Sequence, residues 1–301
     1  MGPGEVTNAG APRHAYFGRV ADMHVHIQPW AMLKPDVHAQ MSAKRHDLER
    51  IRVFNYDSGA FLAFLDEEGI ARVGIVNYPS PDLMGFTHEV NEFVARYCAR
   101  DPRRLVAIGG IHPRFTQDPT GDVDRIADFG VRGFKIHPPH QLFRANAYRS
   151  EEGGLGPLEA IYRRCLERRL PVIVHTGTSI FAGARNKYAD PMDLDDVAID
   201  FPDLTIVVAH GGRPLWMETA FFLVRRHRNV WLDLSSIPPR NLPAYFPKLE
   251  SIADRVLWGT DWPAPGVRSM RENAEAFLEL PYAAETFEKI LVGNAESVFR
   301  A

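Results

Sequence analysis

The segment Arg19-Val-Ala-Asp-Met-His-Val-His-Ile27 is a short apolar run that ends in two histidines separated by one residue. Alternate side chains of an extended strand point the same way. His24 and His26 are therefore expected to project from one face, close enough to bind one metal ion. Further strand-length apolar runs end in His175, His210 and Asp261. Histidines and a carboxylate at the ends of several strands are the ligands that a catalytic divalent-metal site needs.

Eight runs of this kind predict eight strands, and most are rich in Val, Ile and Leu, as in strands buried on both faces of a parallel sheet. The predicted strands are Arg19–Ile27, Ala71–Tyr78, Leu105–Ile111, Gly133–His137, Pro171–His175, Leu204–His210, Val230–Leu234 and Arg255–Asp261. Segments with helical spacing lie between them, at Glu89–Arg100, Leu158–Arg169, Pro214–Arg226 and Ala283–Phe299. Eight alternations in one chain favour an α/β fold of the closed (β/α)8 TIM-barrel type.

The candidate ligands all stand at the C-terminal ends of their predicted strands, the face on which active sites of this barrel form. A doubly wound open sheet is the alternative fold. It would keep the first and eighth strands apart, whereas His24 and Asp261 must meet. The closed barrel is therefore the prediction.

The composition describes a globular chain of 301 residues, 45% hydrophobic and 24% charged, which one barrel-sized domain accommodates. A net charge of −3 gives no reason to expect a nucleic-acid partner. No apolar stretch is long enough to cross a membrane. Cys98 and Cys165 fall in helix-like stretches and are expected to be packing residues, which suggests a reducing cytoplasm. A homo-oligomer is compatible with the sequence.

The domain division expected is a flexible tail over residues 1–15, followed by one barrel domain over residues 16–301. The tail is rich in Gly, Pro and Ala and lacks the apolar core of a signal peptide. A long connection over about 28–59 has two interpretations, a lid over the barrel mouth or a surface excursion with short helices. His38 and His46 within it follow no strand-end pattern and are left out of the site.

Six motifs in this order resemble the amidohydrolase superfamily. They are Asp22-Met-His-Val-His26, Gly133-Phe-Lys-Ile-His-Pro138, Val174-His-Thr-Gly177, Ala209-His-Gly-Gly212, Gly259-Thr-Asp-Trp-Pro263 and Gly293-Asn-Ala295. The branch resembled joins small metal-dependent hydrolases with non-oxidative decarboxylases such as 2-amino-3-carboxymuconate semialdehyde decarboxylase. The resemblance implies one or two divalent ions, zinc first and manganese next, held by His24, His26, His175 and Asp261. It makes His210 a second-metal ligand or a catalytic residue.

The chemistry of these residues agrees with that implication. A bound metal lowers the pKa of its water toward neutrality. Asp261 can ligate the metal, accept the proton of the water and return it to the leaving group. His210 can polarise the reacting carbonyl or donate a proton.

Lys135, on the fourth predicted strand, has three interpretations. It could be carboxylated and bridge two metals, as in two-metal members of the superfamily. It could pair with a carboxylate at the barrel mouth, or its ammonium could anchor an anionic substrate, which is slightly favoured. His112 and His137 end the third and fourth strands and either line the pocket or bond the following loops.

Arg213 follows His210-Gly-Gly and could hold a substrate carboxylate. Arg144, Arg149 and Arg185 lie in loops on the same rim and compete for that role. Trp262 is expected to pack outward behind its strand.

Two enzyme functions, each with a small-molecule substrate, fit these residues. The first is hydrolysis of a small carboxylated or aromatic lactone, ester or amide by metal-activated water, which the Lys135 motif favours. The alternative is metal-dependent, non-oxidative decarboxylation of an aromatic or muconate-type acid. A non-catalytic metal-binding barrel is disfavoured by the intact ligand set. Related hydrolases that act on DNA also start with His-x-His, but no bridging glutamate stands at the end of the third or fourth strand.

Overall fold

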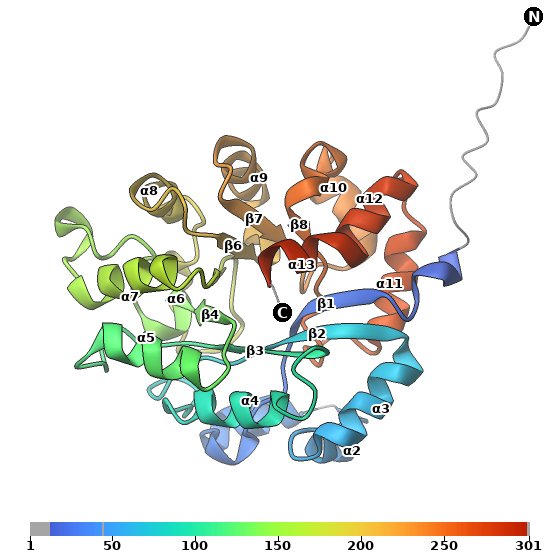
Figure 1. The fold of residues 1–301 in the computed structure, drawn as a ribbon, viewed down its shortest axis with the longest axis horizontal. Helices are drawn as coiled ribbons and strands as arrows, with labels where there is room; N and C mark the ends of the chain where they lie inside the picture. The colour runs from blue at the N-terminus through green and yellow to red at the C-terminus, as the bar shows by residue number, and fades with distance from the viewer. Residues whose placement is uncertain (1–12, 44, 300–301) are drawn as a thin grey trace, which may run out of the picture.

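The computed structural model describes residues 13–43 and 45–299, and its centre is a barrel of eight parallel strands ringed by helices (Figure 1). The strands pair in chain order. They are β1 (Val20–Val25), β2 (Ile70–Val76), β3 (Leu105–Gly109), β4 (Gly133–Ile136), β5 (Val172–His175), β6 (Ile206–Ala209), β7 (Val230–Asp233) and β8 (Val256–Leu257). All eight predicted strands are confirmed, although most end earlier than predicted. His210 and Asp261, for example, have φ angles of 66° and 69°, which an extended strand cannot contain.

Backbone hydrogen bonds between β1 and the segment after β8 complete the barrel. Met23 N donates to Trp258 O at 2.9 Å, Asp261 N to His24 O at 2.8 Å, and His26 N to Trp262 O at 2.7 Å. The first and last strands therefore meet, as the single-domain (β/α)8 barrel requires and an open doubly wound sheet does not.

Thirteen α-helices occur in the described residues, and the longer ones cover the outside of the barrel (Figure 1). They are α1 (Pro35–Ser42), α2 (Leu48–Phe54), α3 (Ser58–Glu68), α4 (Val90–Cys98), α5 (Pro119–Asp128), α6 (Pro138–Gln141), α7 (Gly156–Glu167), α8 (Asp193–Asp200), α9 (Met217–Arg226), α10 (Leu242–Tyr245), α11 (Met270–Leu278), α12 (Ala284–Glu288) and α13 (Asn294–Val298). Short 3-10 helices are η1 (Arg13–Tyr16), η2 (Trp30–Met32), η3 (Ser150–Glu152), η4 (Asn186–Tyr188), η5 (His210–Gly212), η6 (Pro239–Asn241) and η7 (Leu249–Arg255).

The helix predicted over 283–299 is divided, because a π-helix, η8 (Lys289–Gly293), separates α12 from α13. The wider turn comes directly before Asn294, whose amide donates to the carbonyls of Ala253 and Val256 at 2.7 Å each. This anchor ties the last helix to the start of β8. The other three predicted helices are confirmed as α4, α7 and α9.

The interior of the barrel is filled by apolar side chains such as Ile108, Ile173 and Val207. Phe299, just after α13, belongs to the same cluster, and a Cβ on Gly133 at the start of β4 would lie 3.1 Å from its ring. The C-terminal helix thus closes the end of the barrel where the strands begin, which leaves the opposite end for the site.

The segment over 28–59 contains η2, α1 and α2, so it has short helices rather than one irregular loop. The first twelve residues of the predicted tail lie outside the described residues. Cys98 and Cys165 are buried, unpaired packing residues in α4 and α7, as predicted. Within the described residues, none of the helices combines the length and the apolarity that a membrane span demands.

Candidate active site

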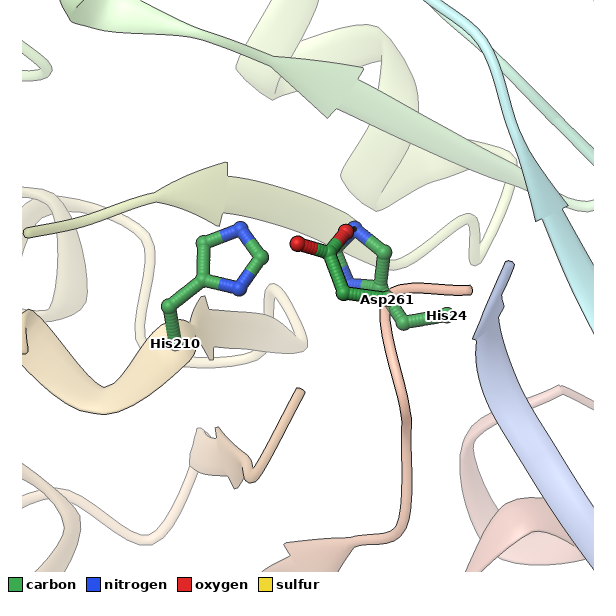
Figure 2. Close-up of side chains that lie close together, drawn as sticks. All are labelled: His24, His210 and Asp261. Carbon is green, nitrogen blue, oxygen red and sulfur yellow. Dashed lines mark ion pairs between the residues drawn. The ribbon is translucent and has the colours of Figure 1, made fainter. Parts of the chain in front are cut away.

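The five residues predicted to form the site come together at the C-terminal end of the barrel. His24 lies in β1, and His175 ends β5; His26, His210 and Asp261 follow β1, β6 and β8. Figure 2 shows His24, His210 and Asp261 turned toward one another. One potential ligand atom from each of these residues lies within 4.8 Å of the other two. All but the half-buried His26 are buried.

Measured contacts join the five side chains into one cluster. Asp261 Oδ1 lies 3.0 Å from His26 Nε2 and 3.7 Å from His24 Nε2. The ring of His210 lies 4.8 Å from that of His24 and 4.7 Å from that of His175, centroid to centroid. Side chains from four strand ends thus surround one small volume.

The outer nitrogens of the β1 histidines are held by acceptors. His24 Nδ1 lies 2.5 Å from Asp233 Oδ2, and His26 Nδ1 lies 2.9 Å from the carbonyl oxygen of Val76. Because a carboxylate and a carbonyl only accept, each Nδ1 carries the hydrogen and each Nε2 presents a lone pair to the cluster. This is the outer-shell arrangement that orients metal-binding histidines.

Two backbone features maintain this geometry. His210 and Asp261 occupy the left-handed region, which costs a non-glycine residue on the order of 1–3 kcal/mol and is typical of functional sites. At Gly259 a Cβ would lie 2.7 Å from Asp233 Oδ1 and 2.8 Å from His24 Cβ. Glycine is therefore required there for Asp233 to reach His24.

The electrostatics of the cluster favour neutral imidazoles beside an ionised carboxylate. Burial lowers the pKa of His24, His175 and His210. Burial acts to raise the pKa of Asp261, but the imidazoles of His26 and His24 and the ammonium of Lys135 outweigh it and lower that pKa to about 2. Neutral imidazole and carboxylate are the protonation states in which these side chains bind metal.

The donor set fits a divalent metal ion. His175 Nε2 is buried and has no hydrogen-bond partner among the described residues, which is costly for a polar atom unless a ligand satisfies it. The lone pairs of His24 and His26 and the ionised Asp261 face the same volume. Three imidazoles and one carboxylate suit zinc and manganese alike.

A cavity of about 420 Å³ opens over the cluster. Its basic wall residues are Lys135, Arg45 and Arg213, and among the described residues Asp261 is the only acidic one that lines it. Trp30, Met41, Met84, Ile180 and Phe181 contribute apolar surface. A small, partly apolar molecule carrying negative charge matches this lining.

Lys135, His137 and Arg213 line the cavity. Lys135 is buried on β4 with Nζ 3.5 Å from His24 Nε2, and burial lowers its pKa to about 8 against the opposing charges of Asp233 and Asp261. The ring of His137 stacks on that of His175 at 3.7 Å. Arg213 Nη2 donates to Ser236 Oγ, while its buried Nε has no partner among the described residues.

His112 and the three competing arginines are not among the residues that line the cavity. The backbone N–H of Arg114 donates to His112 Nδ1 at 3.3 Å, so His112 bonds its own loop. Arg144 pairs with Asp193 and Arg149 with Asp200, each at 2.7 Å. Arg185 donates its backbone N–H to Pro139 O. Trp262 packs behind the strand end against the aromatic rings of α2 and α3.

Several residues of the site were missed by the sequence reasoning. Asp233 ends β7 inside a predicted strand, so the same strand-end pattern could have found it. Tyr78 ended the second predicted strand, and His140 follows His137 in the His-Pro-Pro-His run. Asp22 precedes the two histidines and accepts from Thr260 N at 3.0 Å and Thr260 Oγ1 at 2.6 Å, which fixes the backbone before Asp261.

The chain is similar to a curated relative, the 2-pyrone-4,6-dicarboxylate hydrolase of Comamonas testosteroni. It is 33% identical over 137 residues, which are 32% of this chain and 44% of that protein. The match thus spans less than half of the relative's length.

Two solved structures share the barrel. The TIM-barrel protein Bb4693 of Bordetella bronchiseptica is 23% identical with a TM-score of 0.72, over 93% of this chain and 97% of that chain. A 5-carboxyvanillate decarboxylase of Novosphingobium aromaticivorans, solved with manganese and 3-methoxy-4-hydroxy-5-nitrobenzoic acid, is 17% identical with a TM-score of 0.64, over 94% and 97%. Identities this low establish the fold alone.

The family model Amidohydro_2, described as amidohydrolase, matches residues 21–301. The match begins one residue before Asp22 and includes all the residues of the cluster. The chain therefore belongs to the amidohydrolase family.

Proposed function

We propose that the protein is a metal-dependent hydrolase that opens a small anionic lactone, with pyrone dicarboxylates as the first substrates to test. The observation that carries this proposal is the cavity itself, in which basic side chains surround a histidine–aspartate cluster and Asp261 is the only acidic residue among the described lining residues. The activity in the name of the curated relative, hydrolysis of a cyclic dicarboxylate, supports the same substrate class.

The metal in this proposal is zinc first and manganese next, held by His24, His26, His175 and Asp261. The chemistry that such an ion supplies when bound is activation of water as a nucleophile at neutral pH. Asp261 accepts a proton from the attacking water and returns it to the oxygen released when the carbon–oxygen bond of the lactone breaks.

His210 is proposed to donate to the carbonyl oxygen under attack. The Nδ1 of His210 lies 2.9 Å from the hydroxyl oxygen of Ser235 and 3.2 Å from the backbone carbonyl oxygen of Ser235. When the hydroxyl donates to Nδ1, the hydrogen of the neutral ring lies on Nε2, where it can stabilise negative charge that develops on the substrate. In the other tautomer the hydrogen lies on Nδ1, and the lone pair on Nε2 makes His210 a further potential metal ligand.

Lys135 and Arg213 are proposed to bind the carboxylates of the substrate. The unpartnered Nε of Arg213 gives its guanidinium a donor to spare, and carboxylates accept such bonds in pairs. We propose that the Lys135 ammonium attracts a substrate carboxylate and that Lys135 is not carboxylated to bridge two metals, because carboxylation would remove a positive charge from this wall of the cavity. Arg45 already pairs with Asp47 and donates to Pro263 O, so it joins the 28–59 segment to the loop after β8.

Decarboxylation of an aromatic or muconate-type acid is the second candidate. A 5-carboxyvanillate decarboxylase with bound manganese has the same fold. The same residues could bind that acid, with His210 or Asp261 supplying the proton to the vacated carbon.

The deciding experiment incubates the purified protein with a panel of pyrone dicarboxylates, other small lactones, esters and aromatic acids in ¹⁸O-labelled water. Hydrolysis predicts one labelled oxygen in the product carboxylate and no carbon dioxide. Release of carbon dioxide from an aromatic or muconate-type acid, with no ring opening or ester cleavage anywhere in the panel, would contradict the proposal in favour of the second candidate.

A further inference from the structure

Three polar side chains of the cavity wall form a hydrogen-bonded chain that the mechanism above does not use. Tyr78 follows β2, His140 lies in α6, and Ser179 lies in the loop after β5. Tyr78 Oη is 2.9 Å from His140 Nδ1, and Ser179 Oγ is 2.7 Å from His140 Nε2. All three line the cavity.

This chain lies close to the histidine cluster. The His137 ring stacks on His140 at 3.6 Å and on His175 at 3.7 Å. One imidazole thus separates the chain from His175, and His175 lines the same cavity as the three residues of the chain.

The direction of the hydrogen bonds follows from burial. The His140 ring is neutral, since burial lowers its pKa to about 3, so one nitrogen donates and the other accepts. The bond between Tyr78 and His140 is buried, whereas the bond to Ser179 is only partly buried. A buried hydroxyl hydrogen without an acceptor is costly. Tyr78 therefore donates to Nδ1, and Nε2–H donates to Ser179 Oγ.

The Ser179 hydroxyl then has one hydrogen left to give. Its oxygen accepts from His140 Nε2 and, at 3.4 Å, from the backbone N–H of Phe181. Both lone pairs are thus engaged, and the hydroxyl hydrogen is directed away from the chain. Since Ser179 is partly exposed and lines the cavity, this hydrogen is available to a molecule bound there.

We propose that Ser179 donates a hydrogen bond to a carboxylate oxygen of the substrate, with His140 and Tyr78 as the positioning residues that orient its hydroxyl. The loop of Ser179 is tied to the anion-binding side of the cavity, because Thr178 N donates to Arg213 O at 2.9 Å. The side chains of Ser179 and Arg213 both line the cavity, and in this proposal they bind the same carboxylate. This inference rests on the proposed function in taking the substrate to be a small carboxylate.

The binding test uses 2-pyrone-4,6-dicarboxylate as the probe and the Asp261→Asn variant as the background, so that the probe is not consumed. Calorimetry should show that Ser179→Ala raises the dissociation constant about tenfold to a hundredfold, the range for a lost hydrogen bond to a charged group. His140→Phe should match Ser179→Ala, and His140→Gln should recover part of the affinity, because its amide can both accept and donate. Ser251→Ala, an exposed serine outside the cavity, is the matched control.

A second measurement needs no ligand. In ¹⁵N-histidine NMR spectra the His140 ring should carry its hydrogen on Nε2, and Tyr78→Phe should reduce the population of that tautomer. A hydrogen on Nδ1 in the wild-type chain would overturn the positioning role, whatever the fate of the substrate.

The outcomes separate this inference from the proposed function. Probe binding that Ser179→Ala weakens, without hydrolysis by the wild-type chain, supports the Ser179 contact and contradicts hydrolysis of this lactone. Hydrolysis with an unchanged dissociation constant in Ser179→Ala overturns the contact and leaves the hydrolase standing. Absence of probe binding to the Asp261→Asn chain with Ser179 intact overturns the contact.

Discussion

The two sides of the cavity hold their histidines in different ways. On the β1–β8 side, His24 and His26 each give the Nδ1 hydrogen to a carboxylate or carbonyl oxygen, so that both Nε2 lone pairs face Asp261. On the β4–β5 side, His137 and His140 are stacked, and His140 is held by two hydroxyl groups that can donate or accept.

This difference separates the chemistry from substrate recognition. A carboxylate or carbonyl oxygen can only accept a hydrogen bond, so it keeps the hydrogen of each β1 histidine on Nδ1. The Nε2 lone pairs of both histidines then face one point, where a cation can bind. Hydroxyl groups, and buried atoms with no hydrogen-bond partner in the described part of the chain, such as His137 Nδ1 and Arg213 Nε, leave hydrogen bonds for a ligand to complete. Substitutions on the β1–β8 side should therefore lower the catalytic rate, and substitutions on the β4–β5 side should weaken substrate binding.

The largest loss is expected from Asp261→Asn, which keeps the shape of the side chain and removes its basic carboxylate. The catalytic rate constant should fall about 10²–10⁴-fold, with part of the metal retained. Steady-state kinetics and elemental analysis would measure both quantities. The matched control is Asp203→Asn at an exposed position, and a rate near wild type in Asp261→Asn would rule out a base role.

The comparison predicts opposite outcomes for two histidine-to-alanine variants. His24→Ala should lose metal and rate together, because it removes an inward lone pair. His137→Ala should keep its metal, since that ring stacks on His175 and His140 and supplies none of the proposed metal ligands. Measuring the metal content per chain of both purified variants tests whether the two sides of the cavity have different roles. Equal loss of metal in both variants would contradict that difference.

A smaller effect is expected from Asp233→Asn. The amide can no longer hold the Nδ1 hydrogen of His24 with a full negative charge, and loss of such outer-shell partners typically weakens metal binding about 10–100-fold. Competition with a chelator of known affinity would measure the change. Wild-type metal affinity would show that Asp233 does not orient His24.

The smallest effect is expected from Arg213→Lys, which keeps the charge but loses the forked donor. KM for a dicarboxylate lactone should rise about fivefold, which is about 1 kcal/mol, because the lysine ammonium keeps the charge attraction and one hydrogen bond; kcat should change little. A neutral lactone is the control substrate and should show no such rise. An equal rise for both substrates would remove Arg213 from carboxylate binding.

The sequence predicted the barrel and the cluster because both depend on strand-end periodicity. His24, His26, His175, His210 and Asp261 each follow a buried apolar run, and parallel strands bring such ends together. Placements that depend on loops were harder. His112 ends the third predicted strand as His137 ends the fourth, yet His112 bonds its own loop and His137 lines the cavity.

The arginines illustrate the same limit of local sequence. Arg144 and Arg149 occur on the predicted rim, but carboxylates brought from α8, Asp193 and Asp200, neutralise them. Arg45 and Ser179 reach the cavity from irregular segments whose path no periodicity describes.

Metal dependence is tested most directly by stripping the purified protein with a chelator and titrating it with zinc or manganese while its hydrolysis of 2-pyrone-4,6-dicarboxylate is followed. We expect activity to disappear with the metal and to return in proportion to added ion, and His24→Ala to show no recovery at the same ion concentration. Full activity in the stripped protein would contradict a metal-dependent reaction at this cluster.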